Sequence, residues 1–191
     1  MPVDLMQILS APAEEAARRL LGCEMVREID GKILSGKIVE TEAYHQYDVA
    51  SHSYRGQTPR TKVMFGPAGF LYVYFTYGMH YCCNIVTGAD GEGSAVLIRA
   101  LKPIEGQTEM SLNRKGLEGA ALTNGPAKLC QALLIDKQLN GHNLKQKPLR
   151  LIIKPKLSDN EIVKSTRIGI SRAQDAELRF YIKNNPFVSK T

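Results

Sequence analysis

The chain has 191 residues with a hydrophobic content of 43%, enough for a full core, so we expect residues 1–191 to form a single domain. It carries 25 Lys and Arg against 19 Asp and Glu, and the resulting charge of +6 favours a polyanionic partner. No apolar run approaches the roughly 20 residues of a membrane span, and the first residues lack the features of a secretory signal. The expectation is therefore a cytoplasmic protein without a membrane partner.

The cysteines and histidines show no pattern typical of a metal site or a disulfide framework. None of the four cysteines belongs to a CxxC pair, and the four histidines are scattered without HxxxH spacing. Cys82 and Cys83 would point to opposite faces of a strand, so we expect buried free thiols. A GxxxxGK phosphate loop and a GxGxxG fingerprint are also absent from the sequence. These observations predict no metal and no cofactor.

A helix and a hairpin are the first elements expected along the chain. Pro12 opens a periodic stretch with acids in its first turn, and Gly22 follows it, which predicts a helix over residues 12–22. Apolar residues over 23–28 and 33–40 are typical of two strands, and Asp30-Gly31 between them is a hairpin signal. The helix face expected to join the core consists of Leu9, Ala13, Ala16, Ala17 and Leu20.

The second of these strands runs into an unusual stretch over residues 38–44. Two carboxylates and an aromatic ring alternate there, so Glu40, Glu42 and Tyr44 should point to one face of a regular strand. Burying a carboxylate is unfavourable unless it is paired or hydrogen-bonded. Either the strand end emerges into solvent with both acids hydrated, or the acids belong to a buried polar site.

A long polar loop and a second hairpin are expected next. Residues 44–67 show no regular period and mix aromatic, His, Arg and hydroxyl side chains, which are the types that contact phosphates and stack on bases. Residues 70–76 and 79–86 are typical of two strands joined at Tyr77-Gly78. Tyr77 at the tip either packs onto a neighbouring loop or acts as a wedge that enters a base stack.

The second half of the chain mixes strands and helices without regular alternation, which favours an α+β fold over a doubly wound sheet. The start of the helix at Pro126, with Lys128 in its first turn, is suited to an anion. The expected strands are residues 95–101, 149–153 and 179–182, and the expected helices are residues 103–113 and a stretch from Pro126.

The chemistry of the acids leaves several enzyme classes open. Arg99 interrupts an apolar strand and needs an anionic partner, either Glu40, Glu42 or a bound phosphate. Paired carboxylates fit a glycoside hydrolase, but the chain has no Trp to form a sugar platform. Hydrolysis of an N-glycosidic bond needs only one carboxylate to activate water, and the basic excess favours a nucleic acid substrate. A Cys82–His80 nucleophile is less favoured, because alternate positions on a strand usually indicate packing.

Many short motifs, in order and over nearly the whole chain, closely resemble the alkyladenine (3-methyladenine) DNA glycosylase family. They are Val39–Tyr44, Ala50–His52, Thr58–Arg60, Met64-Phe65, Leu71–Tyr74, Tyr77–Met79, Asn84-Ile85, Leu97–Leu101, Gly125–Leu129 and Arg167–Gly169. The resemblance implies an α+β domain with a curved antiparallel or mixed β-sheet, surrounding helices and a protruding β-hairpin. It also implies a monofunctional base-excision repair enzyme that flips a damaged purine out of duplex DNA, hydrolyses its N-glycosidic bond and leaves an abasic site.

The resemblance assigns a catalytic group of three residues. Glu42 matches the general base that deprotonates the attacking water and stabilises the developing oxocarbenium ion. Arg99 and the carbonyl of Ile168 match the groups that position this water. No Lys stands where a Schiff-base nucleophile is expected, so we expect no lyase step.

The resemblance also assigns a pocket for the flipped base. Tyr44, His52 and Tyr74 match the residues that sandwich it, and their electron-rich faces suit cationic alkylated purines. Asn84 matches a residue that disfavours the exocyclic amino group of normal guanine. The stretch between Tyr44 and His52 is shorter than usual and lacks the glycine often found there, so the path of the chain to His52 is an open point.

The resemblance also implies which residues contact the DNA duplex. Tyr77, with Met79 near it, matches the wedge that fills the hole left in the duplex. Thr58, Arg60 and Lys128 are expected to lie on phosphates because of their chemistry and place. The expected partner is double-stranded DNA with damaged purines, bound by a monomer. Two alternatives are a catalytically inactive DNA-binding module of the same fold and a hydrolase of free nucleosides.

Overall fold

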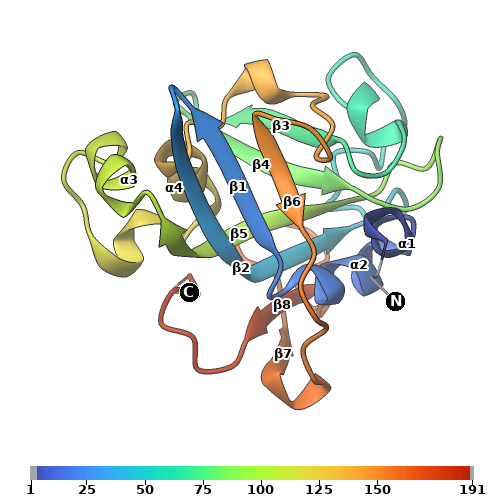
Figure 1. The fold of residues 1–191 in the computed structure, drawn as a ribbon. Helices are drawn as coiled ribbons and strands as arrows, with labels where there is room; N and C mark the ends of the chain where they lie inside the picture. The colour runs from blue at the N-terminus through green and yellow to red at the C-terminus, as the bar shows by residue number, and fades with distance from the viewer. Residues whose placement is uncertain (1–3, 190–191) are drawn as a thin grey trace.

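The computed structural model of the protein describes residues 4–189, which form eight strands, four α-helices and four short 3-10 helices (Figure 1). The strands are β1 (Glu24–Ile29), β2 (Lys32–Tyr44), β3 (Leu71–Thr76), β4 (His80–Val86), β5 (Ala95–Glu105), β6 (Leu149–Ile152), β7 (Ile162–Ser165) and β8 (Arg179–Ile182). The helices are α1 (Leu5–Leu9), α2 (Ala13–Leu20), α3 (Gln107–Asn113) and α4 (Pro126–Ala132), with 3-10 helices η1 (Lys62–Phe65), η2 (Gly119–Leu122), η3 (Lys137–Leu139) and η4 (Asp159–Glu161).

The strands form one curled antiparallel sheet with β2 at its centre (Figure 1). The strand order is β3-β4-β5-β2-β1-β6, and β8 joins β2 and carries β7 on its other edge. One edge of β2 pairs with β5, whereas the other pairs with β1 in its first half and with β8 from Glu40 to Glu42. The 13 residues of β2 therefore connect the arm formed by β3, β4 and β5 to the arm formed by β1, β6 and β8. The α+β class and the curved antiparallel sheet expected from the sequence are confirmed.

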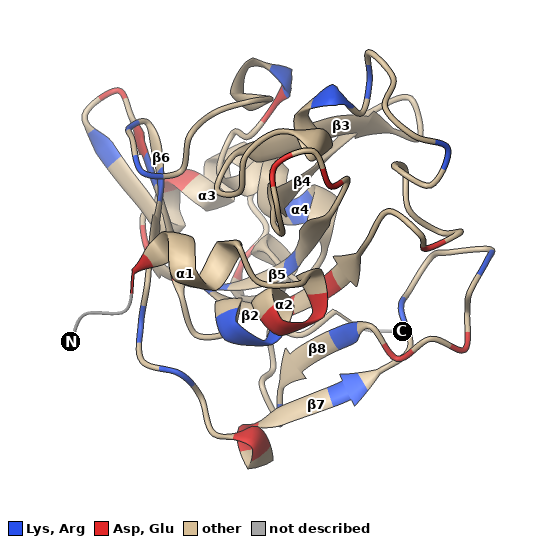
Figure 2. Ribbon diagram, turned by 90° about the vertical axis from the view of Figure 1, so that its right-hand side faces the viewer, with Lys and Arg blue, Asp and Glu red and all other residues tan. Residues whose placement is uncertain are grey.

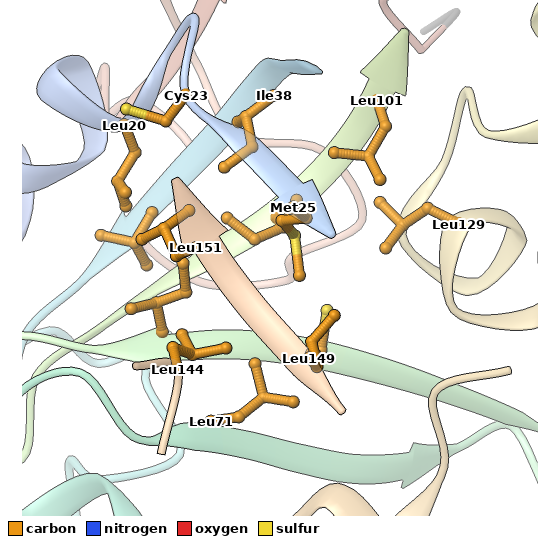
Figure 3. Close-up of a cluster of buried hydrophobic side chains, with 14 of the residues drawn as sticks. Leu20, Cys23, Met25, Ile38, Leu71, Leu101, Leu129, Leu144, Leu149 and Leu151 are labelled. Atoms are coloured by element: carbon orange, nitrogen blue, oxygen red, sulfur yellow. The ribbon is translucent and has the colours of Figure 1, made fainter. Parts of the chain in front are cut away.

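An apolar core lies inside the curl of the sheet (Figure 3). Side chains from both arms of the sheet point at one another there, and helices α2 and α4 add to them. Burial of each large aliphatic side chain stabilises the fold by roughly 1.5–3 kcal/mol before the entropy of folding is subtracted. The members labelled in the figure include Met25 from β1, Ile38 from β2, Leu101 from β5, Leu149 from β6, Leu20 from α2 and Leu129 from α4.

The helix expected over residues 12–22 and the hairpin at Asp30-Gly31 are confirmed as α2 and as the β1–β2 connection. The apolar face of this helix is buried as expected. The hydroxyl of Thr41 donates to the carbonyl of Ala17 at 3.0 Å and anchors the end of β2 to α2. This anchor fixes the part of β2 that carries the acidic residues.

The prediction of a helix over residues 103–113 is wrong for its first residues. Strand β5 continues to Glu105, and α3 begins only at Gln107. Between them Gly106 has φ +77°, and a Cβ on it would lie 2.5 Å from the carbonyl oxygen of Ile33. Because only glycine tolerates both this φ and this approach, the chain changes from strand to helix at that point. Strand β7 was also missed, since its four residues are too few for a clear period.

The predicted β3–β4 hairpin is confirmed, with Tyr77-Gly78 at its tip. Both residues have positive φ, 50° and 67°, as in the two-residue turns that match the twist of a hairpin. A bulky side chain at positive φ is unfavourable by roughly 1–2 kcal/mol. The Tyr77 side chain is 83% exposed, so the interpretation in which it packs onto a neighbouring loop is wrong. Tyr77 thus combines positive φ with an exposed aromatic ring at the hairpin tip.

Lys and Arg are distributed over several faces, including the loops beside β3, helix α2 and the β7–β8 hairpin (Figure 2). Several of them pair with acids, as Lys147 and Arg150 do with Glu28. None of the helices within residues 4–189 combines the length and the apolar composition that a membrane crossing requires.

Candidate active site

A cavity of about 550 Å³ opens where the end of β2 meets the β3–β4 hairpin. Its wall combines residues from β2 and the loop after it, from the hairpin, from β5 and from the segment 168–172. Its lining combines aromatic rings with polar side chains. This size and mixture suit a small, flat organic group that is held by stacking and oriented by a few hydrogen bonds.

The Glu42 carboxylate lies directly behind this wall and is fully buried. Its Oε1 accepts a hydrogen bond from the backbone N–H of Ile168 at 2.8 Å and lies 3.2 Å from Nη1 of Arg99. Its Oε2 accepts from the hydroxyl of Tyr44 at 2.8 Å. These three partners line the cavity, whereas Glu42 itself does not. The interpretation in which both acids are hydrated is therefore wrong.

The donors around Glu42 leave part of its acceptor capacity free. A carboxylate offers about four lone-pair positions, and three are used here, two on Oε1 and one on Oε2. Burial and the neighbouring Glu42 charge raise the pKa of Tyr44 above its ordinary value, so this hydroxyl stays protonated and donates a hydrogen bond to Oε2. One acceptor position on Oε2 therefore remains free.

Arg99 joins the two carboxylates of β2. Its Nε lies 3.4 Å from Oε1 of Glu40, and its Nη1 faces Glu42. The register between β2 and β5 shifts on both sides of Glu40. Such bulges re-aim side chains and are common beside active sites. The expectations that Glu40 and Glu42 share a face and that Arg99 finds an acidic partner there are both confirmed.

Tyr44 is held from behind by a buried ion pair. The guanidinium carbon of Arg167 lies 4.6 Å from the centre of the Tyr44 ring. Arg167 also donates to the carbonyl of Ala43 at 3.1 Å and binds both carboxylate oxygens of Asp48. Burial alone would raise the pKa of Asp48, but hydrogen bonds from Arg167 and from the N–H of Ala50 hold it below its usual value. This ion pair connects the loop after β2 to the segment that carries Ile168.

Three aromatic side chains form one wall of the cavity. The rings of His52 and Tyr74 meet edge to face with centres 4.6 Å apart, and those of Tyr72 and Tyr74 stack at 5.7 Å. Nδ1 of His52 shares a hydrogen bond with the Tyr72 hydroxyl at 3.1 Å. The shorter loop thus still brings His52 to the cavity that Tyr44 also lines. Arg60 lies over Tyr74, with its guanidinium carbon 5.8 Å from the ring centre.

His52 is expected to stay neutral in the working pH range. Desolvation and the charge of Arg60 lower its pKa to about 4. Since the folded protein disfavours the imidazolium, this histidine lowers stability as the pH falls from about 6.5, its ordinary pKa, towards 4. We expect an NMR titration of the His52 ring to show a midpoint near 4, and Arg60→Gln to raise that midpoint. A midpoint near 6.5 in both proteins would contradict this electrostatic assignment.

The floor of the cavity contains Asn84 and Cys82, neighbours of the aromatic wall in the β3–β4 ladder. Nδ2 of Asn84 donates to the carbonyl of Tyr72 at 3.2 Å, which fixes the amide. Burial and the neighbouring Cys83 raise the pKa of Cys82 to about 11, so its sulfur remains a thiol at neutral pH. A thiol of this kind is a poor nucleophile, which argues against the Cys82–His80 alternative.

Of the residues expected on DNA, two line the cavity and three do not. Tyr77 and Arg60 line the cavity mouth, and Met79 beside the tip is 69% exposed. Thr58 is engaged in a local turn, where its hydroxyl pairs with that of Thr61 at 3.0 Å. The ammonium of Lys128 donates to Oδ1 of Asn124 at 2.8 Å, next to the cavity residue Pro126.

Some residues of the site were not identified from the sequence. Arg167 and Asp48 form the ion pair behind Tyr44 although 119 residues separate them, and no local motif signals such a pair. Arg172 lines the cavity without an acidic partner within residues 4–189. The backbone N–H of Ile168 contacts Glu42, whereas the role expected for its carbonyl in positioning the water stays a prediction. Across the same residues no group of three or more His, Cys, Asp or Glu side chains is placed to hold a metal ion.

Comparison with known proteins agrees with the resemblance. A family model described as methylpurine-DNA glycosylase matches residues 7–186. A protein of Carboxydothermus hydrogenoformans is 55% identical over 175 residues, which cover 91% of this chain and 92% of the relative. Proteins of Francisella tularensis and Methanoculleus marisnigri are 50% and 48% identical, over 98% and 91% of this chain and 98% and 92% of their own lengths. All three carry provisional names as 3-methyladenine DNA glycosylases. The chain therefore belongs to the methylpurine-DNA glycosylase family.

Proposed function

We propose that the protein is a monofunctional DNA glycosylase that hydrolyses the N-glycosidic bond of damaged purines in duplex DNA. The observation that carries this proposal is the Glu42 carboxylate, held by three donors behind an aromatic cavity whose rim bears the exposed Tyr77. The names of the family and of the relatives support the same activity.

The cavity would receive the flipped base. Flipping costs a few kcal/mol, least for a damaged base that pairs poorly. Tyr44 on one side and His52 with Tyr74 on the other would stack on the base, and a neutral His52 avoids repulsion of a cationic alkylated purine. Asn84, whose Nδ2 is fixed by its bond to the carbonyl of Tyr72, would disfavour the exocyclic amino group of normal guanine, as the resemblance implies.

Glu42 would act on the water that attacks the sugar. For a cationic alkylated purine, the water oxygen bonds to the anomeric carbon, one water proton passes to the free position on Oε2, and the purine leaves as a neutral base with the electrons of the broken C–N bond. The negative charge of Glu42 would stabilise the oxocarbenium ion as that bond lengthens. Because Glu42 is fully buried in this structure, a lesion in the cavity must be accompanied by a small shift of Tyr44, Arg99 or Ile168 that admits the water.

The two alternative functions, an inactive DNA-binding module and a hydrolase of free nucleosides, each leave a feature of the site unexplained. A binding module would not need a buried carboxylate behind its cavity, paired with a guanidinium in the cavity wall, since an acid opposes the phosphate backbone. A hydrolase of free nucleosides would have no use for a strained, exposed Tyr77 beside the cavity mouth. Hydrolysis of a damaged purine in duplex DNA would require both the buried carboxylate and the exposed Tyr77.

Tyr77→Ala is expected to weaken binding to lesion-containing duplex by about 1–3 kcal/mol, the usual value of an aromatic ring stacked on a base. Binding to the same strand without its complement should change far less, because no hole in a duplex has to be filled. Fluorescence anisotropy with labelled DNA measures both affinities. Tyr47→Ala is a matched control, since Tyr47 is 80% exposed but does not line the cavity. Equal losses for duplex and single strand would argue against a wedge.

The activity itself is tested with duplexes that contain a single hypoxanthine or 3-methyladenine. Incubation with the protein is followed by alkali, which cleaves the strand at abasic sites. We expect cleavage at the lesion and none in the undamaged duplex. Absence of cleavage on any lesion would refute the enzyme and favour the binding module.

A further inference from the structure

The other carboxylate of β2, that of Glu40, has more hydrogen-bond and ion-pair partners than Glu42, although the proposed reaction does not use it. The Glu40 side chain is fully buried. Its Oε1 accepts from Nε of Arg179 at 2.7 Å and from the hydroxyl of Ser189 at 2.8 Å, and its Oε2 accepts from the backbone N–H of Ser189 at 2.7 Å. Arg99 adds a fourth contact at 3.4 Å. Oε1 thus accepts two hydrogen bonds and lies in an ion pair with Arg99, so Glu40 is poorly placed to activate water.

The groups that hold Glu40 come from the last part of the described chain. Arg179 opens β8, which pairs with β2 from Glu40 to Glu42. Its side chain is 5% exposed and lies over the ring of Tyr181, 4.8 Å from the ring centre, which restricts its orientation. Ser189 is separated from Glu40 by 149 residues and is also buried. None of Glu40, Arg179 and Ser189 lines the cavity, so none is placed to touch a bound base.

Arg99 contacts the carboxylates of both Glu40 and Glu42. Its guanidinium is 8% exposed and faces one carboxylate through Nε and the other through Nη1. Two carboxylates and two guanidinium groups balance in charge, so Glu40 compensates one of the two cations. Loss of the contacts to Glu40 would leave Arg99 free to move towards Glu42 and tilt its carboxylate. Such small displacements matter, because catalysis depends on orientation to a fraction of an ångström.

We propose that Glu40, held by Arg179 and by Ser189, is a positioning residue that fixes Arg99 and thereby orients the Glu42 carboxylate towards its water. The inference rests on the proposed function, since it concerns the rate of the same reaction. It assigns Arg179 and Ser189 a part in catalysis without contact with the bound base. The rate of base release should therefore depend on Ser189, and the affinity for DNA should not.

A graded series at Ser189 tests this proposal. Ser189→Ala removes the hydroxyl donor and is expected to slow single-turnover base release roughly 3- to 10-fold. Ser189→Pro removes the backbone donor as well and should slow it roughly 10- to 100-fold. Ser189→Thr keeps both donors and should restore a rate within about 2-fold of the wild type. The rate is measured with excess enzyme on a duplex with one hypoxanthine, and affinity for that duplex is measured by anisotropy.

A structural role alone would give a different result. Thr123→Val is the matched control, because it removes a buried hydroxyl that donates to the carbonyl of Leu101 at 2.6 Å and does not line the cavity. It should lower the melting temperature and leave the rate constant at 25 °C unchanged. Ser189 variants that melt earlier but release base at the wild-type rate would overturn the inference alone. A wild-type protein that releases no base would overturn the proposed function, and this inference with it.

Discussion

Glu42→Gln is expected to slow base release by about 10²- to 10⁴-fold, the usual contribution of a general base. Gln keeps an oxygen for the N–H of Ile168, but it cannot take a proton from water, and its amide would meet the hydroxyl donor of Tyr44. Affinity for lesion-containing duplex should remain, since Glu42 does not line the cavity. Single-turnover kinetics give the rate, and anisotropy on the same duplex gives the affinity.

Glu105→Gln provides the matched control for this change of charge. Glu105 is an exposed acid at the end of β5 and makes no contact with the cavity. Its replacement should alter neither rate nor affinity. If Glu42→Gln released base as fast as Glu105→Gln, another group would have to activate the water.

Arg99→Leu should have the largest effect on stability. It removes the only cation paired with Glu42 within residues 4–189 and one of two cations paired with Glu40. Breaking a buried pair by deleting one partner costs about 3–5 kcal/mol, because an uncompensated charge remains inside the protein. Urea unfolding at neutral pH measures this loss as a lower midpoint, and base release should fall as well.

Arg150→Leu controls for the loss of a surface ion pair. Arg150 is 38% exposed and pairs with Glu28 at 2.6 Å. Exposed pairs of this kind contribute roughly 0–1 kcal/mol. The two variants therefore separate a buried network from ordinary surface charge. Equal unfolding midpoints would show that the contacts of Arg99 add little to the fold.

Local patterns were sufficient to predict the elements that carry the central residues. Alternation along β2 placed Glu40 and Glu42 on one face, and Tyr77-Gly78 between two apolar runs placed Tyr77 at a hairpin tip. The need of a buried Arg for an acid linked Arg99 to those carboxylates before any contact was known. These inferences depend on local periods and on the need of a buried charge for a partner of opposite sign.

The remaining features depend on contacts that no local pattern encodes. The ion pair of Arg167 with Asp48 and the bonds of Ser189 to Glu40 join segments more than 100 residues apart. The extension of β5 beyond Leu101 depends on pairing with β2, which overrode the helix signal of Pro103. Tertiary pairing of this kind routinely outweighs local propensity.

The identity of the bases released from duplex DNA treated with an alkylating or a deaminating agent tests the central claim most directly. Mass spectrometry of the small molecules in solution, together with a count of abasic sites in the same DNA, gives both products of the reaction. The proposed function predicts free damaged purines in equal number to new abasic sites, without an enzyme–DNA adduct after borohydride treatment. Release of no base, or a borohydride-trapped adduct, would contradict hydrolysis by a water molecule that Glu42 activates.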